Sequence, residues 1–189
     1  MTKGKILATI GLLTFLPTDT AIANAEFSIG IAQHRADFRL ASRNSNFDTT
    51  IRDHALDSTI LTFTGRYYYS DNFSVGARAL TGINDTDDFE LSGGLNNGYE
   101  VFVGTQYRLG KQWSFVGDAG LGYSDVEYAR PRGRSDIRYL GPILRVGLAY
   151  EFSPNINLNM EYTWLDRVSD DHVGAEKTQT LGLSIGYRF

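Results

Sequence analysis

The stretch that decides the fold is Thr180-Leu-Gly-Leu-Ser-Ile-Gly-Tyr-Arg-Phe189, in which apolar residues alternate strictly with small or polar ones. Such a period of two residues predicts a β-strand with one apolar face. The apolar face is aliphatic in its middle and ends in Tyr187 and Phe189. About ten residues suffice for a tilted strand to cross a bilayer, and aromatic side chains favour the headgroup level. A strand of a soluble sandwich is the alternative that this stretch alone leaves open.

The same alternation recurs in seven earlier stretches, which makes eight predicted strands. These stretches are 27–31, 61–69, 73–79, 99–108, 113–123, 144–152 and 158–164. Tight turns are predicted at 70–72, 110–112 and 153–155, and long polar loops at 33–57, 81–97, 125–136 and 166–179. Tight and long connections therefore lie at opposite ends of the strands, as in barrels with short periplasmic turns and long outer loops. We predict an all-β protein, an eight-stranded antiparallel up-and-down transmembrane β-barrel, whose even strand count lets the sheet close.

Aromatic residues indicate which face of the strands meets lipid. One group lies at the tight-turn ends and includes Tyr69, Tyr107 and Trp113, and a second group nearer the long loops includes Tyr99 and Trp164. Two aromatic belts that flank an aliphatic band are typical of a bilayer-spanning barrel. We therefore expect the apolar face to point outward.

The composition and the N-terminus agree with export to a bacterial envelope. The 189 residues predict one domain, the chain has no Cys, and a net charge of −4 gives no indication of nucleic acid as a partner. Lys3 and Lys5 precede an apolar run, and Ala23-Asn24-Ala25 supplies the small residues of a cleavage site. We expect a signal peptide over 1–25, a barrel domain over 26–189, and location in the bacterial outer membrane.

The strand positions that alternate with the apolar ones carry charged residues of both signs. These are Arg66, Arg78, Arg108, Arg145 and Arg188 with Glu100, Asp118, Glu151 and Glu161. The interior of an eight-stranded barrel is only wide enough to be filled by side chains, and a buried charge needs a partner. We expect a salt-bridged lumen that is closed, and a narrow, low-conductance channel is the alternative.

Two segments carry a family resemblance. The hairpin from Leu148-Ala149-Tyr150 through Ser153-Pro154 to Glu161-Tyr162-x-Trp164, with the terminal Tyr187-Arg188-Phe189, resembles the last hairpin of the OmpA-type transmembrane barrel. The stretch 99–123 is similar to the OmpX and Ail branch of small barrels. The resemblance implies an eight-stranded barrel. OmpA continues into a periplasmic peptidoglycan-binding domain, but this sequence stops at Phe189, so we do not expect that activity here. The resemblance also implies insertion by the barrel-assembly machinery, with Tyr187 and Phe189 as the assembly signal, and an acidic lumen role for Glu161.

Catalysis and metal binding find little support in the sequence. A lipid A-modifying barrel would need a base beside its nucleophile, but His34, His54 and His172 all fall in predicted outer loops. The acidic groups 85–90 and 170–171 lack the ordered spacing of a calcium loop. We expect no enzyme activity, no metal and no cofactor.

The predicted third loop is the best candidate for ligand binding. Arg130, Arg132 and Arg134 lie close together, with Arg138 nearby, and guanidinium groups pair well with phosphate or sulfate. Partners would be outer-membrane lipids, lipopolysaccharide phosphates, an extracellular glycan or a protein. Pairing of these arginines with the acidic second loop is the alternative. We expect a structural or adhesin-like surface role.

Overall fold

The computed structural model describes residues 24–43, 49–84, 86–87, 92–130, 133–166 and 174–189. For 38–43, 49–53, 86–87, 130, 133–134 and 174–176 it describes the backbone alone. The strands are β1 (Ala25–Arg43), β2 (Thr49–Ser70), β3 (Phe73–Asn84), β4 (Thr86–Asp87), β5 (Ser92–Arg108), β6 (Trp113–Arg130), β7 (Gly133–Ser153), β8 (Ile156–Asp166) and β9 (Gly174–Arg188). No helix in this part of the chain is long and apolar enough to span a membrane.

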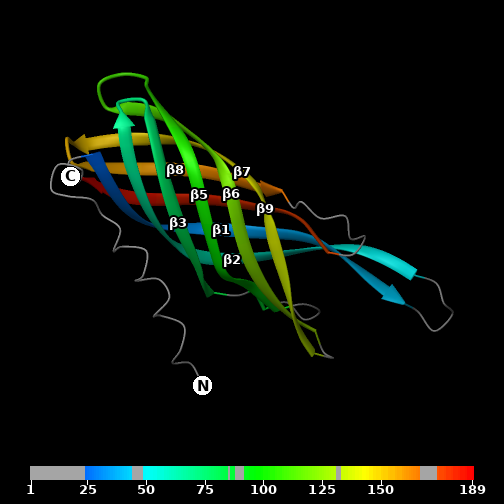
Figure 1. The fold of residues 1–189 in the computed structure, drawn as a ribbon. Coiled ribbons are helices and arrows are strands. Elements are labelled where there is room, and N and C mark those ends of the chain that lie inside the picture. Colours follow the sequence, from blue (N-terminus) through cyan, green and yellow to red (C-terminus); the bar gives the residue numbers. More distant parts are fainter. Residues whose placement is uncertain (1–23, 44–48, 85, 88–91, 131–132, 167–173) are drawn as a thin grey trace.

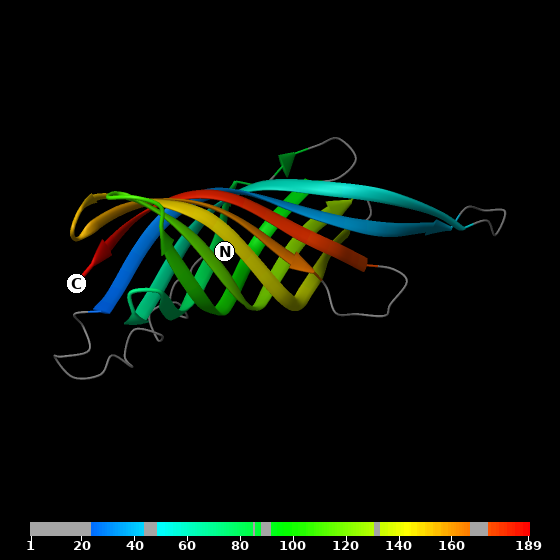
Figure 2. The ribbon, with the colours of Figure 1, turned by 90° about the horizontal axis from the view of Figure 1, so that it is seen from above.

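The sheet closes into an antiparallel barrel of eight strands (Figures 1 and 2). Each strand pairs with its neighbour in the chain, β1 pairs with β9, and β3 pairs with β5. The two-residue strand β4 adds only a short pairing at the outer end of β5. The predicted fold class and the three tight turns are therefore confirmed, with turns at 71–72, 109–112 and 154–155.

The prediction of long loops at the opposite end is wrong for most of their length. β1 and β2 stay paired as far as Arg43 and Thr49, and β6 and β7 as far as Arg130 and Gly133. Figure 1 shows the β1–β2 hairpin running well past the other strands. A hairpin that projects from a bilayer meets water on both faces, so its sequence loses the apolar alternation that signals a strand.

The aliphatic side chains point outward, as the aromatic belts predicted. Val101 is 59% exposed and Leu183 51% exposed, although both lie in the middle of their strands. Aromatic side chains flank this band: Tyr69, Tyr107 and Trp113 are exposed at the tight-turn end, and Tyr99 and Trp164 toward the other end. An exposed apolar band between two aromatic belts is the surface that a bilayer covers.

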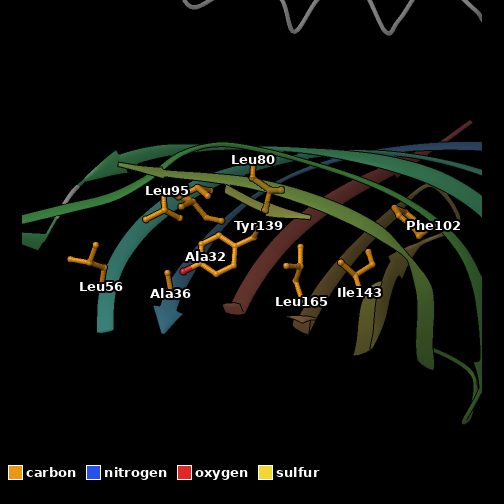
Figure 3. Close-up of a cluster of buried hydrophobic side chains, with 11 residues drawn as sticks. Ala32, Ala36, Leu56, Leu80, Leu95, Phe102, Tyr139, Ile143 and Leu165 are labelled. Carbon is orange, nitrogen blue, oxygen red and sulfur yellow. The ribbon is translucent and has the colours of Figure 1, made fainter. Parts of the chain in front are cut away.

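The inward positions form three layers along the barrel. Hydrogen-bonding groups lie at the tight-turn end, arginines and carboxylates in the middle, and apolar side chains toward the outer hairpins. The apolar layer, shown in Figure 3, was not predicted. It consists of Ala32, Ala36, Leu56, Ile60, Leu80, Leu95, Phe102, Val126, Tyr139, Ile143 and Leu165.

Candidate functional site

The middle of the lumen is occupied by a charge network centred on Asp118 of β6. Its carboxylate accepts two hydrogen bonds from Arg66 of β2, at 2.9 Å from Nη1 and 2.8 Å from Nη2. Arg145 of β7 donates to the same carboxylate from Nη1 at 2.8 Å. In the closed sheet β3 and β5 lie between β2, which carries Arg66, and β6, which carries Asp118. The contact between these two side chains therefore crosses the lumen.

Arg145 is completely buried, and each of its donor groups has a partner. In addition to Asp118, its guanidinium pairs with Glu100 of β5 and donates from Nε to the Thr163 hydroxyl at 3.1 Å. A buried cation is tolerated only when its charge is compensated and its donors are satisfied. Both conditions are met here, so Arg145 holds β5, β6, β7 and β8 together.

The two arginines that share Asp118 both lie against the ring of Phe102. The guanidinium carbon of Arg66 lies 4.9 Å from the centroid of the Phe102 ring, and that of Arg145 lies 4.7 Å from it. Cations over an aromatic face are attracted by the ring quadrupole. Phe102 occupies one of the inward-facing strand positions, which were predicted to be polar, and it also belongs to the apolar layer.

A second ion pair completes the middle layer. Arg78 of β3 pairs with Glu161 of β8 and donates from Nε to the Thr64 hydroxyl at 2.9 Å. The layer thus contains three arginines balanced by three carboxylates, all with side chains no more than 11% exposed. The charged side chains and Phe102 thus occupy the middle of the lumen.

The tight-turn end of the lumen is an open, polar vestibule with an empty volume of about 570 Å³. Glu26 of β1 accepts hydrogen bonds from the Tyr68 hydroxyl at 2.9 Å and from Arg188 at 3.1 Å. Arg188 also stacks over the Tyr68 ring at 4.1 Å. Sequence reasoning missed Glu26 and Tyr68, although both lie on the inward parity beside apolar neighbours.

Two of the nine predicted lumen charges lie at the rim instead of inside. Arg108 and Glu151 form an ion pair at 3.6 Å, with side chains 68% and 37% exposed. Both residues occur on the polar parity but next to a tight turn, where inward-pointing side chains leave the barrel and meet solvent. The structure therefore brings Arg66, Arg78, Arg145, Glu100, Asp118 and Glu161 into one layer, Arg188 into the vestibule, and Arg108 and Glu151 to the rim.

The prediction that His34 and His54 lie in loops is also wrong, because they belong to β1 and β2. His34 is 2% exposed and points into the lumen, where its Nδ1 lies 2.9 Å from the Thr180 hydroxyl. His172 lies outside the described residues, as do Arg132 and the acidic positions 85, 88–90 and 170–171.

For Arg130 and Arg134 of the predicted anion-binding cluster, the structure describes the backbone alone. Arg130 ends β6 opposite Gly133, and Arg134 pairs with Ala129, so these two arginines lie at the outer end of the β6–β7 hairpin. Asp136 and Arg138, farther along β7, are exposed. The expectation that the cluster binds an anion concerns side chains that lie outside the described part.

The terminal aromatic pair lies at the tight-turn rim. Tyr187 and Phe189 are each 48% exposed, and their rings meet edge to face at 5.0 Å. Phe27 of β1 packs on Phe189 at 5.9 Å, and the Phe189 amide donates to the Ala25 carbonyl at 2.9 Å. These contacts attach the end of the chain to the seam where β1 meets β9.

Comparison with known proteins agrees with this architecture. The model of the outer membrane protein beta-barrel domain family matches residues 7–189. Comparison with curated protein sequences finds no match.

Similar solved structures include Neisserial surface protein A, with 12% identity, a TM-score of 0.59, and coverage of 87% of this chain and 99% of that one. The attachment invasion locus protein Ail of Yersinia pestis has 17% identity and a TM-score of 0.55, with coverage of 87% and 97%. OprG of Pseudomonas aeruginosa has 14% identity and a TM-score of 0.53, with coverage of 88% and 97%. At these identities the likeness concerns the fold.

Proposed function

The chain belongs to the outer membrane protein beta-barrel family, and from this premise we propose that it is a closed, non-conducting scaffold that presents its outer hairpins at the cell surface. The observation that carries the proposal is the double obstruction of the lumen. A charged layer with no net formal charge lies beneath an apolar layer in which Ile60, Val126 and Tyr139 have no exposed surface.

An ion that crosses this lumen would have to break ion pairs and then shed its water among aliphatic side chains. The penalty for removing an ion from water into such surroundings is several kcal/mol or more. An apolar constriction of this kind excludes ions even where water molecules fit between the side chains. Closure therefore rests on two independent barriers.

Planar-bilayer recording tests closure directly. We expect no stepwise conductance from the purified protein at neutral pH in 1 M KCl. A steady small pore whose conductance changes on Glu161→Gln or Arg145→Met would establish the narrow-channel alternative instead. Heat-modifiable migration in SDS gels provides the control that every variant has folded, since closed barrels resist SDS.

The second part of the proposal concerns the ligand of the β6–β7 hairpin. Its tip carries Arg130, Arg132 and Arg134 in the sequence, and arginine favours phosphate and sulfate groups. One solved structure that shares the fold, at 18% identity and a TM-score of 0.52, is Ail in complex with the heparin analogue sucrose octasulfate. We propose a sulfated glycan or lipopolysaccharide phosphate as the ligand of this tip.

Binding to immobilised heparin and to lipopolysaccharide, measured in detergent at two salt concentrations, tests this ligand. Changing Arg130, Arg132 and Arg134 to Ala should reduce binding at least tenfold. The double variant Arg108→Ala with Lys111→Ala removes positive charge at the opposite, tight-turn end and should leave binding unchanged. Equal affinities of the two variants would dispose of the hairpin tip as the binding site.

We further propose export through a signal peptide cleaved after Ala25, insertion by the barrel-assembly machinery, and no enzyme activity. The hydroxyl of Thr180 lies beside His34 Nδ1, but both residues are buried inside the barrel, away from lipid. Mass spectrometry of the protein from outer membranes should give Glu26 as the first residue. The lipid A mass spectrum should be the same with and without the protein, and an altered acyl count would refute the absence of enzyme activity.

A further inference from the structure

A second, smaller cavity lies in the lumen beyond the vestibule. It has room for about one water molecule. Polar residues from four strands line it: Thr62 of β2, Arg78 of β3, Glu161 and Thr163 of β8, and Thr180 and Ser184 of β9. A cavity of this size with several hydrogen-bonding groups is of the kind that holds an ordered water.

Glu161 connects the two cavities because its side chain lines both of them. On one side is the vestibule, which is open to solvent at the tight-turn end. On the other side are Thr163, Thr180 and Ser184. The ion pair of Glu161 with Arg78 therefore forms a thin polar partition, whereas the opposite side of the lumen is filled by Phe102 and the aliphatic cluster.

Two buried polar atoms on this side of the lumen have no partner among the described residues. They are the hydroxyl oxygen of Ser184 and the Nε2 atom of His34. Leaving a buried polar group unsatisfied costs about 1–3 kcal/mol, and internal water is the usual explanation of such groups. Since Ser184 lines the small cavity, a water molecule there supplies its missing partner.

Thr180 extends the polar path from the small cavity to His34. Its side chain lines the cavity, and its hydroxyl lies 2.9 Å from His34 Nδ1. Neutral groups face His34 from the strands beside it: Ser58 of β2 and Thr180 of β9 lie opposite it in register, with Leu56 and Thr178 next to them. The charged groups nearest along the path are Arg78 and Glu161, and His54 lies farther out on β2.

The path ends at His34 on the outer side. Ala36, Leu56 and Tyr139 of the apolar layer are each 2% exposed or less. Figure 3 shows the Tyr139 ring beside Ala32 and Ala36, and its hydroxyl lies 3.4 Å from the Asp37 carbonyl oxygen, to which it donates. His34 is thus covered from the outer mouth but linked by polar groups to the vestibule.

We propose that a water-mediated proton relay runs from the vestibule through the small cavity and Thr180 to His34. In the relay a hydronium ion in the vestibule gives a proton to the Glu161 carboxylate, which lines both cavities, and Glu161 gives one to the cavity water. That water passes one on to the Thr180 oxygen. The original Thr180 hydroxyl proton then forms the N–H bond at His34 Nδ1, so that the imidazole gains one positive charge and the vestibule loses one. This relay does not depend on what the outer hairpins bind, and it is compatible with a lumen closed to other ions.

Exchange of protons between His34 Nδ1 and water tests the relay. The protein would be labelled with ¹⁵N-histidine, placed in phospholipid nanodiscs and studied by NMR, with the signals of the three histidines assigned through His34→Gln. We expect measurable exchange in the unmodified protein. Thr180→Val removes the hydroxyl but keeps the shape, and should slow the exchange at least tenfold, while Thr180→Ser should restore it.

Thr178→Val is the matched control, since Thr178 is buried on the same face of β9 but does not line the small cavity. It should change the exchange rate less than twofold. If Thr180→Val does not fold, as judged by gel migration, Ser184→Ala replaces it, because Ser184 lines the same cavity and its hydroxyl has no partner among the described residues. An exchange rate that both cavity variants leave unchanged, or equal slowing by Thr178→Val, would overturn the relay.

Discussion

Arg145→Met should destabilise the barrel far more than any comparable change at its rim. The replacement keeps an unbranched side chain of similar length but removes the guanidinium that pairs with Glu100 and Asp118. Asp118 keeps Arg66 as its partner at 2.8 Å, whereas Glu100 is left as a buried carboxylate without its cation. Removing one partner of a buried ion pair costs about 3–5 kcal/mol, so the free energy of unfolding should fall by about that amount.

Urea unfolding of the protein in detergent micelles, followed by tryptophan fluorescence, measures this loss. Arg108→Met is the matched control, because Arg108 forms an exposed ion pair at 3.6 Å, and its effect should stay within about 0.5 kcal/mol. The double variant Arg145→Met with Glu100→Gln should recover part of the stability, since no uncompensated carboxylate remains. If Arg145→Met costs no more than Arg108→Met, the buried network does not contribute as argued.

Two further pairs of variants test the lumen and the lipid-facing surface. Gly104→Ala would place a methyl group 2.1 Å from Asp118 Oδ1 and should lower the free energy of unfolding by about 1–3 kcal/mol. The control Gly110→Ala places its methyl group in open space and should change the free energy of unfolding by less than about 0.5 kcal/mol. Equal effects of the two changes would contradict the tight packing around Asp118. Leu183→Arg puts a charge in the middle of the outward band and should cost about 2–4 kcal/mol, against about 0–1 kcal/mol for Gln179→Arg near its edge. Equal unfolding midpoints in lipid vesicles for these last two would argue against an outward face that meets lipid.

The strands inside the bilayer could be predicted because lipid and lumen impose opposite demands on alternate residues. Above the bilayer this contrast disappears, so the stretches 33–43 and 49–57 were interpreted as loop although they continue β1 and β2. His34 was placed in a loop for a related reason: it faces the lumen, but its outward-facing neighbours Gln33 and Arg35 are polar, so the apolar alternation is lost there too. Where both faces of a strand meet water, periodicity gives no strand signal.

The alternation of residues along each strand predicts which charged side chains point into the lumen. It does not predict which of these charges pair with each other. Which residues share a level depends on the stagger between strands, and Arg66 and Asp118 are 52 positions apart in the sequence. The apolar layer did leave a signal. Consecutive apolar pairs such as Ile60-Leu61, Ile143-Leu144 and Trp164-Leu165 break the alternation at the level where the inward residues become aliphatic.

The position of Asp118 between Arg66 and Arg145 bears on how the barrel assembles. Arg145 faces Asp118 in register on the neighbouring strand β7, whereas Arg66 reaches it from β2 across the lumen. The pair of Asp118 with Arg145 can therefore form within the β6–β7 hairpin, but its pair with Arg66 requires the sheet to have curled. The contact of Arg66 thus stabilises the curled sheet and not the separate hairpins, so this part of the network favours the finished cylinder over an unclosed precursor.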